Sequence, residues 1–223
     1  MRAARHLGLD VADHEIITTG RGDNVFVSKR FDRVQLDGQL HRLHQEDFAQ
    51  ALAVDPALKY QADGGPGLGD FARLLNAFPS AAGEKARRAL FDALVFTVAA
   101  VNTDAHAKNY AIVHLGRQMR LAPLYDLGTN VLYGGRETVV SAVTIGGARA
   151  MEGIGLKNFL AAAKTLRVDP DYAEASVHRI RGGVADAFAT ARDETLTDSA
   201  GKNYVDKLVD AIVARAQIRG WTS

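Results

Sequence analysis

Cysteine is absent from the 223 residues, which excludes a disulfide framework, a thiolate nucleophile and cysteine-ligated zinc or iron–sulfur sites. No apolar run approaches the roughly 20 residues of a membrane helix, and the N-terminus lacks the apolar stretch of a signal peptide. Charge of one sign is also lacking, since 27 Lys and Arg stand against 26 Asp and Glu. We therefore expect a cytoplasmic, folded protein with no membrane partner and no direct contact with DNA.

The first part of the chain has the pattern of a β-hairpin. Residues 15–18 and 25–28 are rich in β-branched and aromatic side chains, and Gly20 and Gly22 lie between them in a polar turn. The preceding residues are typical of the end of a helix that stops at Gly8. This predicts a small β-containing piece through about residue 35.

The remainder is predicted to be mainly helical. Apolar residues recur at helical spacing over 70–78 and especially over 82–101, which predicts a long buried helix. A loop-rich connector is expected over 42–69. Three short strands are expected over 110–113, 119–121 and 139–143, followed by helices over 156–166, about 169–191 and about 198–219. The prediction is an α+β chain with a partial β-containing N-lobe, 1–35, and a helical C-lobe, 36–223.

Polar side chains gather between the long helix and the next strand, over residues 102–109. Asp104 and Asn109 have the D-x-x-x-x-N spacing of a protein-kinase catalytic loop, in which the Asp accepts the substrate hydroxyl proton and the Asn holds magnesium. Lys108 could offset charge on a transferring phosphoryl group. His106 taken alone is more typical of a hydrogen-bonded structural residue than of a base.

A second carboxylate, Asp126, follows a short predicted hairpin in the sequence Tyr-Asp-Leu-Gly, where kinases place a magnesium-binding Asp. Magnesium bound to ATP needs only one or two protein oxygen ligands, so Asn109 and Asp126 suffice. Each motif is weak by itself, since an Asp before Leu-Gly is often a turn or cap residue. Their joint order along the chain favours a phosphotransferase.

These motifs are similar to those of one family. The chain resembles the C-terminal kinase region of HipA-type serine/threonine kinases, the toxin components of bacterial toxin–antitoxin pairs. The resemblance rests on KRFDR at 29–33, RLHQEDF at 42–48, LKYQADGGPG at 58–67, NTDAHAKN at 102–109 and LAPLYDL at 121–127.

The resemblance implies a role for each matching residue. Asp104 would be the catalytic carboxylate assisted by Lys108, and Asn109 and Asp126 would bind Mg²⁺. The expected nucleotide-binding residues are Lys29 and Phe31, through their backbone at the adenine, Asp32 and Gln45 near the ribose, and His106. Two structural interpretations stay open: a solvated charged turn at 30–33, and a purely structural glycine loop at 59–67.

The family's Gly-rich segment and its phosphate-pairing lysine have no counterpart in this sequence. Three explanations compete: a split kinase with a separate N-terminal subunit, a truncated product, or a degenerate remnant. The spaced polar triad favours the first two. Loss of the lysine normally cripples phosphoryl transfer, which depends on positioning and charge neutralisation.

We therefore expect a kinase that uses ATP and Mg²⁺ to phosphorylate a protein Ser or Thr. The family pattern suggests an aminoacyl-tRNA synthetase as substrate and a helix-turn-helix antitoxin of HipB type as partner, with DNA reached only through the antitoxin. The alternative is a catalytically impaired module that binds an antitoxin or another protein. A metal-assisted hydrolase is disfavoured, because the sequence offers neither a nucleophile nor a second metal cluster.

Overall fold

The computed structural model describes residues 1–116, 118–133, 138–195 and 199–221. The elements in chain order are α1 (Arg2–His6), β1 (His14–Thr18), β2 (Asn24–Ser28), β3 (Arg33–Leu36), β4 (Gln39–Arg42), β5 (His44–Asp47), α2 (Phe48–Ala51), the 3₁₀ turns Pro56–Leu58 and Gln61–Asp63, α3 (Leu68–Asn76), α4 (Ser80–Ala99), the 3₁₀ turn Ala107–Asn109, β6 (Ala111–Leu115), β7 (Gln118–Leu121), β8 (Val140–Ile145), β9 (Ala148–Ala150), the 3₁₀ turn Met151–Gly153, α5 (Leu156–Leu166), α6 (Pro170–Asp193) and α7 (Ser199–Ile218).

The helix α4 forms the centre of the body. Every side chain from Leu90 to Ala99 is buried, because α3, α5, α6 and β7 pack around it. The C-terminal half of α4 is apolar apart from Asp92 and Thr97, and such a segment is expected to be enclosed in this way. The predicted long buried helix is thereby confirmed, and its C-terminal end delivers the chain to the polar loop 102–109.

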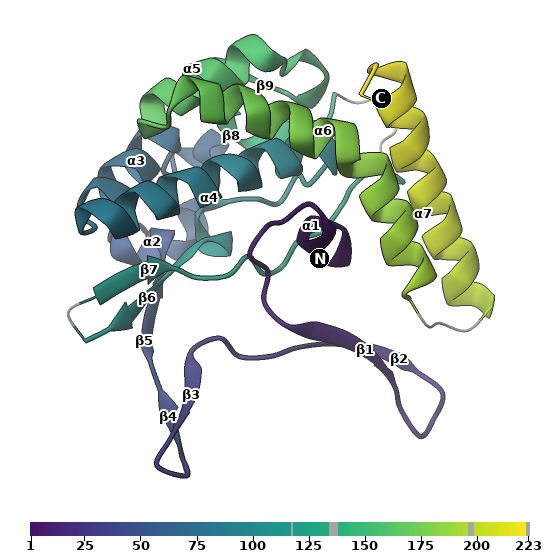
Figure 1. The fold of residues 1–223 in the computed structure, drawn as a ribbon, viewed down its shortest axis with the longest axis horizontal. Coiled ribbons are helices and arrows are strands. Elements are labelled where there is room, and N and C mark those ends of the chain that lie inside the picture. The colour runs from purple at the N-terminus through teal and green to yellow at the C-terminus, as the bar shows by residue number, and fades with distance from the viewer. Residues whose placement is uncertain (117, 134–137, 196–198, 222–223) are drawn as a thin grey trace.

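A buried polar network joins α4 to α6. The Asp92 carboxylate accepts hydrogen bonds from the Tyr172 hydroxyl at 2.9 Å, the Ser176 hydroxyl at 2.5 Å and the Arg179 guanidinium at 2.8 Å. α6 itself begins where the sequence predicts, because Asp169 caps its first turn and Pro170 occupies the first helical position. Its other faces contact α1, α5 and α7, which runs beside it (Figure 1).

A three-stranded antiparallel sheet, β5-β6-β7, lies beneath the helices. The hairpin β6–β7 is the one predicted from the sequence. The prediction of a loop-rich connector over 42–69 is wrong at its start, because residues 44–47 form β5 and pair with β6. The polar sequence His-Gln-Glu-Asp has no apolar alternation, so its strand depends on tertiary pairing rather than on local propensity.

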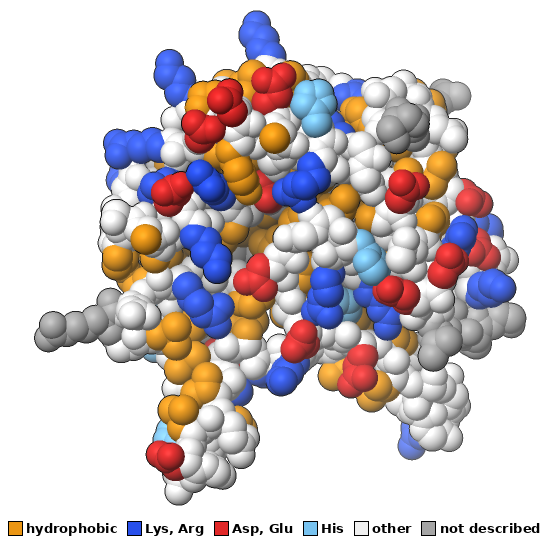
Figure 2. Space-filling view, in the orientation of Figure 1, with side chains coloured by type: hydrophobic (Ala, Val, Ile, Leu, Met, Phe, Trp, Pro, Cys, Tyr) orange, Lys and Arg blue, Asp and Glu red, His pale blue; other side chains and the backbone are white. Residues whose placement is uncertain are grey.

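Two hairpins, β1–β2 and β3–β4, project from the same side of the body (Figure 1). The first confirms the predicted hairpin. The second was not predicted, and the expected boundary between residues 35 and 36 falls within β3; the division into two lobes remains a prediction. Both hairpins carry exposed large apolar side chains, since Phe26 is 54% exposed and Leu40 is 67% exposed. Figure 2 shows hydrophobic side chains on the β3–β4 projection at the lower left.

The mixture of small sheets and a helical body confirms the α+β prediction. Within the described residues, no helix is both long and apolar enough to span a bilayer.

Candidate functional site

The loop 102–109 begins at a strained turn. Val101 follows α4 with a φ of 56°, a left-handed conformation that is unfavourable for a β-branched residue. The turn is held from a neighbouring segment, because the Thr129 hydroxyl bonds the Ala100 carbonyl at 2.6 Å and the Asn130 amide bonds the Val101 carbonyl at 2.8 Å. The surrounding structure therefore fixes the direction in which the loop leaves the helix.

Asp104 and Asn109 are connected through the loop backbone. The Asn109 side-chain nitrogen donates to the Asp104 carbonyl at 2.6 Å, and the buried Asn102 side chain accepts from the Asp104 amide at 3.1 Å. The first bond occupies the nitrogen of the Asn109 amide and leaves its oxygen as the atom that can ligate a cation. The Asp104 carboxylate is half exposed, at 53%, so it is accessible to a ligand.

His106 lies beneath Asp104. Its Nε2 is 3.6 Å from the Asp104 carboxylate, and its ring is buried against the edge of Tyr60. Burial lowers the pKa of His106, and the carboxylates of Asp104 and Asp126 oppose this shift. The carboxylates of Asp104 and Asp126 therefore both act electrostatically on the imidazole of His106.

Asp126 is exposed and stands in a second strained turn, with a φ of 53°. The preceding Leu124 is tied to the N-terminal segment, because its amide donates to the Asp10 carbonyl at 2.8 Å and its carbonyl accepts from the Ala12 amide at 2.9 Å. Tyr125 donates its hydroxyl to the Lys108 carbonyl at 2.7 Å. This bond links the segment carrying Asp126 directly to the 3₁₀ turn that carries Lys108 and Asn109.

The predicted nucleotide-binding residues surround an apolar patch on the sheet. Phe31 packs on Tyr125, with ring centroids 5.5 Å apart, and joins a cluster with Ala111, Val113 and Ala122. Gln45 extends from β5 opposite Val113, and its side-chain oxygen is buried without a hydrogen-bond partner among the described residues. A buried acceptor without a donor is costly, so this atom fits a site that receives a hydroxyl from a ligand such as a ribose.

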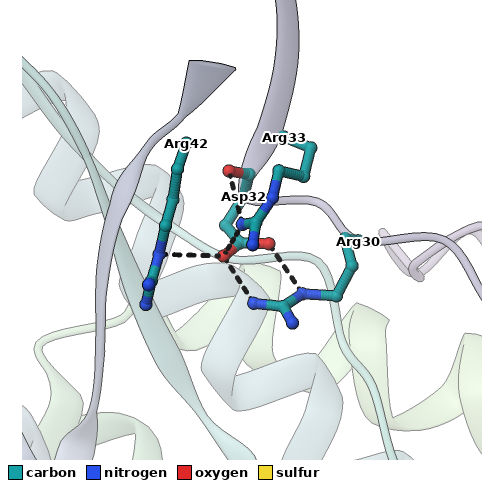
Figure 3. A network of polar contacts seen from close by, with 4 residues as sticks. All are labelled: Arg30, Asp32, Arg33 and Arg42. Carbon is teal, nitrogen blue, oxygen red and sulfur yellow. Dashed lines mark hydrogen bonds and ion pairs between the residues drawn. The ribbon is translucent and has the colours of Figure 1, made fainter. Parts of the chain in front are cut away.

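Asp32 is enclosed by arginines (Figure 3). Its side chain is 1% exposed and accepts from the Arg30 guanidinium at 2.8 and 2.6 Å and from Arg33 at 2.5 Å, while Arg42 is 3.9 Å away. The Arg30 hydrogen bonds hold the pKa of the Asp32 carboxyl below its ordinary value. The interpretation of 30–33 as a solvated charged turn is wrong for Asp32, and both carboxylate oxygens are already engaged.

Lys29 is exposed, and its amide donates to the Asp13 carbonyl at 2.7 Å, which extends the β1–β2 pairing. An adenine contact through the Lys29 backbone would therefore use its carbonyl. The side-chain oxygens of Asn109 and Asp126 are of the kind that binds Mg²⁺, and Gln45 and Asp104 add further polar oxygens to the candidate site.

Tyr60 was not among the predicted site residues, although it lies in the glycine-containing loop 59–67. Its hydroxyl donates a hydrogen bond to the Asp104 carboxylate, and this bond is the main reason that the pKa of Tyr60 rises to about 12. The loop is also structural, as expected, because a side chain at Gly65 would lie 2.0 Å from the Leu58 carbonyl. The polar sequence Lys-Tyr-Gln could have indicated Tyr60, because a Tyr next to a glycine turn can extend its hydroxyl toward a neighbouring loop.

A family model and two named kinases match this chain in sequence. The model of the HipA-like C-terminal domain matches residues 1–188. Y4mE of Sinorhizobium fredii, named "Putative kinase Y4mE", is 31% identical over 98% of this chain and 51% of its own length. The serine/threonine-protein kinase toxin HipA of Shewanella oneidensis is 31% identical over 60% of this chain and 33% of its own length.

Solved structures agree in fold. The HipA toxin in the Shewanella oneidensis complex of HipA, HipB and operator DNA superposes with a TM-score of 0.83 at 23% identity, over 97% of this chain and 53% of that one. The Helicobacter pylori proinflammatory kinase CtkA superposes with a TM-score of 0.55 at 16% identity, over 98% of this chain and 84% of that one. The chain thus spans about half the length of Y4mE and of the HipA structure, and a third of the curated HipA toxin.

Proposed function

Because this chain belongs to the family of HipA-like C-terminal domains, a kinase family, we propose that it is the catalytic lobe of a kinase that transfers the γ-phosphate of Mg-ATP to a protein Ser or Thr. The observation that carries the proposal is the arrangement of Asp104, Asn109 and Asp126. The Asn109 amide is hydrogen-bonded to the Asp104 backbone, Tyr125 ties the Asp126 turn to the same loop, and both carboxylates act on His106.

Each residue has a chemical role in this proposal. The Asp104 carboxylate accepts a hydrogen bond from the acceptor hydroxyl and takes its proton, a role for which it is exposed. The amide oxygen of Asn109 and the carboxylate of Asp126 hold Mg²⁺, which neutralises phosphate charge when it is bound. Lys108, next to Asn109, offsets charge on the phosphoryl group.

The nucleotide base is proposed to lie on the apolar patch of Phe31, Ala111, Val113 and Ala122, with the orphaned oxygen of Gln45 accepting from the ribose. Asp32 acts indirectly here. Its carboxylate fixes the arginines around it and so sets the course of the backbone from Lys29 to Phe31.

An acceptor side is suggested by a cavity of about 270 Å³ beside Tyr60 and Thr103, which is lined further by Asn130, Ser141 and Arg149. Tyr60 lines this cavity and its hydroxyl contacts the Asp104 carboxylate, so we propose that a serine or threonine side chain approaches Asp104 from this side. To do so it would replace the Tyr60 hydroxyl as hydrogen-bond donor to Asp104.

We further propose that a second polypeptide segment completes the nucleotide lobe. An isolated two-stranded hairpin is marginally stable in water, and β1–β2 and β3–β4 both expose apolar side chains such as Phe26, Leu36 and Leu40. Further strands that pack on these hairpins would bury them and could supply a phosphate-binding lysine. Y4mE and the HipA structure are about twice as long as this chain, which supports this view.

The partner is proposed by analogy with a solved structural relative, and the substrate from the resemblance to the HipA family. One structural relative is described in complex with HipB and its operator DNA, so an antitoxin of HipB type is the proposed protein partner, and DNA is reached through it. An aminoacyl-tRNA synthetase is the proposed substrate.

Phosphotransfer tests the proposal directly. The purified chain, alone and together with the polypeptide encoded next to it, is incubated with Mg²⁺, γ-labelled ATP and a library of Ser/Thr peptides. We expect transfer in the combined sample and a loss of about 10²–10⁴-fold in Asp104→Ala. The matched control is Asp210→Ala, an exposed carboxylate on α7, which should keep wild-type activity. Equal transfer by wild type and Asp104→Ala overturns the catalytic assignment.

A second candidate function is a non-catalytic module that binds an antitoxin or another protein. The exposed apolar hairpins favour it, because a surface of that kind suits a protein partner whether or not chemistry follows. No transfer by wild type in either sample, together with binding of the neighbouring polypeptide, would support this function over the kinase.

A further inference from the structure

Three potential metal ligands lie on one face of the β5–β6 pair, on strands that also carry the proposed nucleotide site. His44 pairs directly with His114 across the antiparallel ladder, and Glu46 follows His44 by two residues. Side chains two apart on a strand share a face, so His44, Glu46 and His114 point the same way. Gln45 and Val113 point to the opposite face.

The donor atoms have the separations of a metal-binding site. Nε2 of His114 is 3.0 Å from Oε2 of Glu46, and Nε2 of His44 is 3.7 Å from the same oxygen. The ligand atoms all lie within 4.8 Å of one another, and the two imidazole rings are 4.9 Å apart. Ligands at about 2.1 Å from a tetrahedral zinc ion are roughly 3.4 Å from each other, so the cluster needs only small side-chain shifts to receive one.

We propose that His44, Glu46 and His114 bind a divalent transition metal of the zinc class. Two imidazoles and one carboxylate form a ligand set used for zinc in proteins, with a fourth position left to water. Mg²⁺ prefers oxygen ligands and octahedral geometry, so it suits this site poorly. Throughout the described ranges, no other group of three His, Asp or Glu side chains is placed closely enough to hold an ion.

The strand register preorganises these ligands. Backbone pairing fixes the two strands that carry all three side chains, and the site is accessible, since His44 is 67% and His114 27% exposed. A bound ion would clamp β5 onto β6. Because binding to the folded state alone stabilises that state, the ion would raise the thermal midpoint of the chain.

The chain contains its own control for a simple histidine–glutamate hydrogen bond. Nε2 of His6 lies 2.9 Å from Oε2 of Glu194, nearly the same separation as in the His114–Glu46 pair, but no second histidine adjoins it in the described structure. If His–Glu pairing alone attracted zinc, both places would bind. Zinc binding at the β5–β6 pair therefore depends on the second imidazole.

The test is a zinc titration of the metal-free chain in competition with a chromophoric chelator. We expect one Zn²⁺ per wild-type chain, unaffected by excess Mg²⁺. Loss of a direct ligand in His114→Ala or His44→Ala should weaken binding by more than the roughly 10–100-fold that removal of an outer-shell partner costs. The matched variant His6→Ala should bind Zn²⁺ as wild type does. Thermal unfolding with and without Zn²⁺ gives a second measurement, in which wild type and His6→Ala shift upward and His114→Ala does not.

Far-ultraviolet circular dichroism in the presence of EDTA distinguishes a misfolded variant from one that has only lost a zinc ligand. Glu46→Gln is a conservative third variant, because it keeps the shape of the side chain. Co²⁺ substitution gives an independent readout, since a tetrahedral site with nitrogen ligands yields strong visible bands. Zinc binding that is equal in wild type, His44→Ala and His114→Ala, or absent from wild type, overturns the proposal. Phosphotransfer is not used, so this outcome is independent of the kinase assignment.

Discussion

The phenolic hydroxyl of Tyr60 donates a hydrogen bond to the carboxylate of Asp104. The two residues are far apart in the sequence, and the contact joins the glycine-rich loop to the loop that follows α4. Lys59 also links the two loops. Its carbonyl accepts a hydrogen bond from the Ala107 amide at 3.3 Å, and its ammonium lies 5.1 Å from the Tyr60 ring centroid. The glycine-rich loop is thus part of the candidate site as well as a structural turn.

The Tyr60–Asp104 contact predicts a shift in tyrosine ionisation. The pKa of Tyr60 is about 12, chiefly because its hydroxyl is hydrogen-bonded to Asp104 and burial adds to the effect. Asp104→Ala should return the pKa toward the ordinary value of about 10. NMR of ring-labelled tyrosine at about pH 10.5 should find Tyr60 protonated in wild type and more extensively ionised in the variant. Asp210→Ala is the control, and an unchanged Tyr60 signal in Asp104→Ala would contradict the contact.

Asp32 should hold the segment between the two hairpins in place. Asp32→Asn removes the negative charge that Arg30, Arg33 and Arg42 share, and we expect local stability to fall by about 2 kcal/mol. The amide of Leu43, which donates to the Asp32 carbonyl at 2.8 Å, should then exchange roughly 30-fold faster. Hydrogen exchange at Leu43 measures this effect.

The difference in local stability between wild type and Asp32→Asn should depend on pH. The Arg30 hydrogen bonds lower the pKa of Asp32 below 3.8, so its stabilising contribution is present above that pH and is lost as the pH falls through the folded-state pKa. The difference between wild type and Asp32→Asn should therefore shrink in acid. Asp37→Asn, at an exposed turn position between β3 and β4, is the control. Equal protection of Leu43 in all three proteins at neutral pH would refute the role of Asp32.

Stability at alkaline pH should depend on Tyr110. Burial raises its pKa to about 12, against an ordinary value of 10.0. Between these values the native state keeps the proton and the unfolded chain loses it, so the free energy of unfolding is fully supported below pH 10 and falls as the pH rises, by up to about 1.4 kcal/mol per pH unit for one such group.

Urea unfolding at about pH 8 and about pH 11 measures this dependence. Tyr110→Phe removes the titrating group and should lose less stability between the two pH values than wild type does. Tyr60→Phe provides a comparison for the loss of stability in alkali. The pKa of Tyr60 is also raised to about 12, but the Tyr60 side chain is half-buried at the surface. The same loss in wild type and Tyr110→Phe would show that Tyr110 does not titrate in this way.

Strong local patterns made most of the fold predictable. α4 has apolar residues at helical spacing, α6 begins with a capping Asp and a Pro, and β1–β2 has a glycine-containing turn, so each was located to within a few residues. By contrast, β5 is a polar strand that exists because β6 pairs with it, and β3–β4 is short and flanked by arginines. Local periodicity does not predict pairing between strands that are distant in the sequence.

The candidate site divides in the same way. Asp104, Asn109 and Asp126 were identified because their spacing matches a known catalytic order, although their roles stay predictions. Tyr60 was missed because its contact spans two loops, and the enclosure of Asp32 was missed because Arg42 comes from the next hairpin. The His44–Glu46–His114 group required the β5–β6 register, which the sequence does not reveal.

The most direct test of the site is paramagnetic broadening by Mn²⁺, which accepts the same oxygen ligands as Mg²⁺. The ion is titrated into the ¹⁵N-labelled chain carrying His114→Ala, so that the second cluster is removed. We predict that the amides of residues 104–109 and 126–128 broaden together, and that a further Asp126→Asn substitution abolishes the effect at both segments. Broadening that appears at one segment without the other, or that survives Asp126→Asn, would contradict a metal site shared by Asn109 and Asp126.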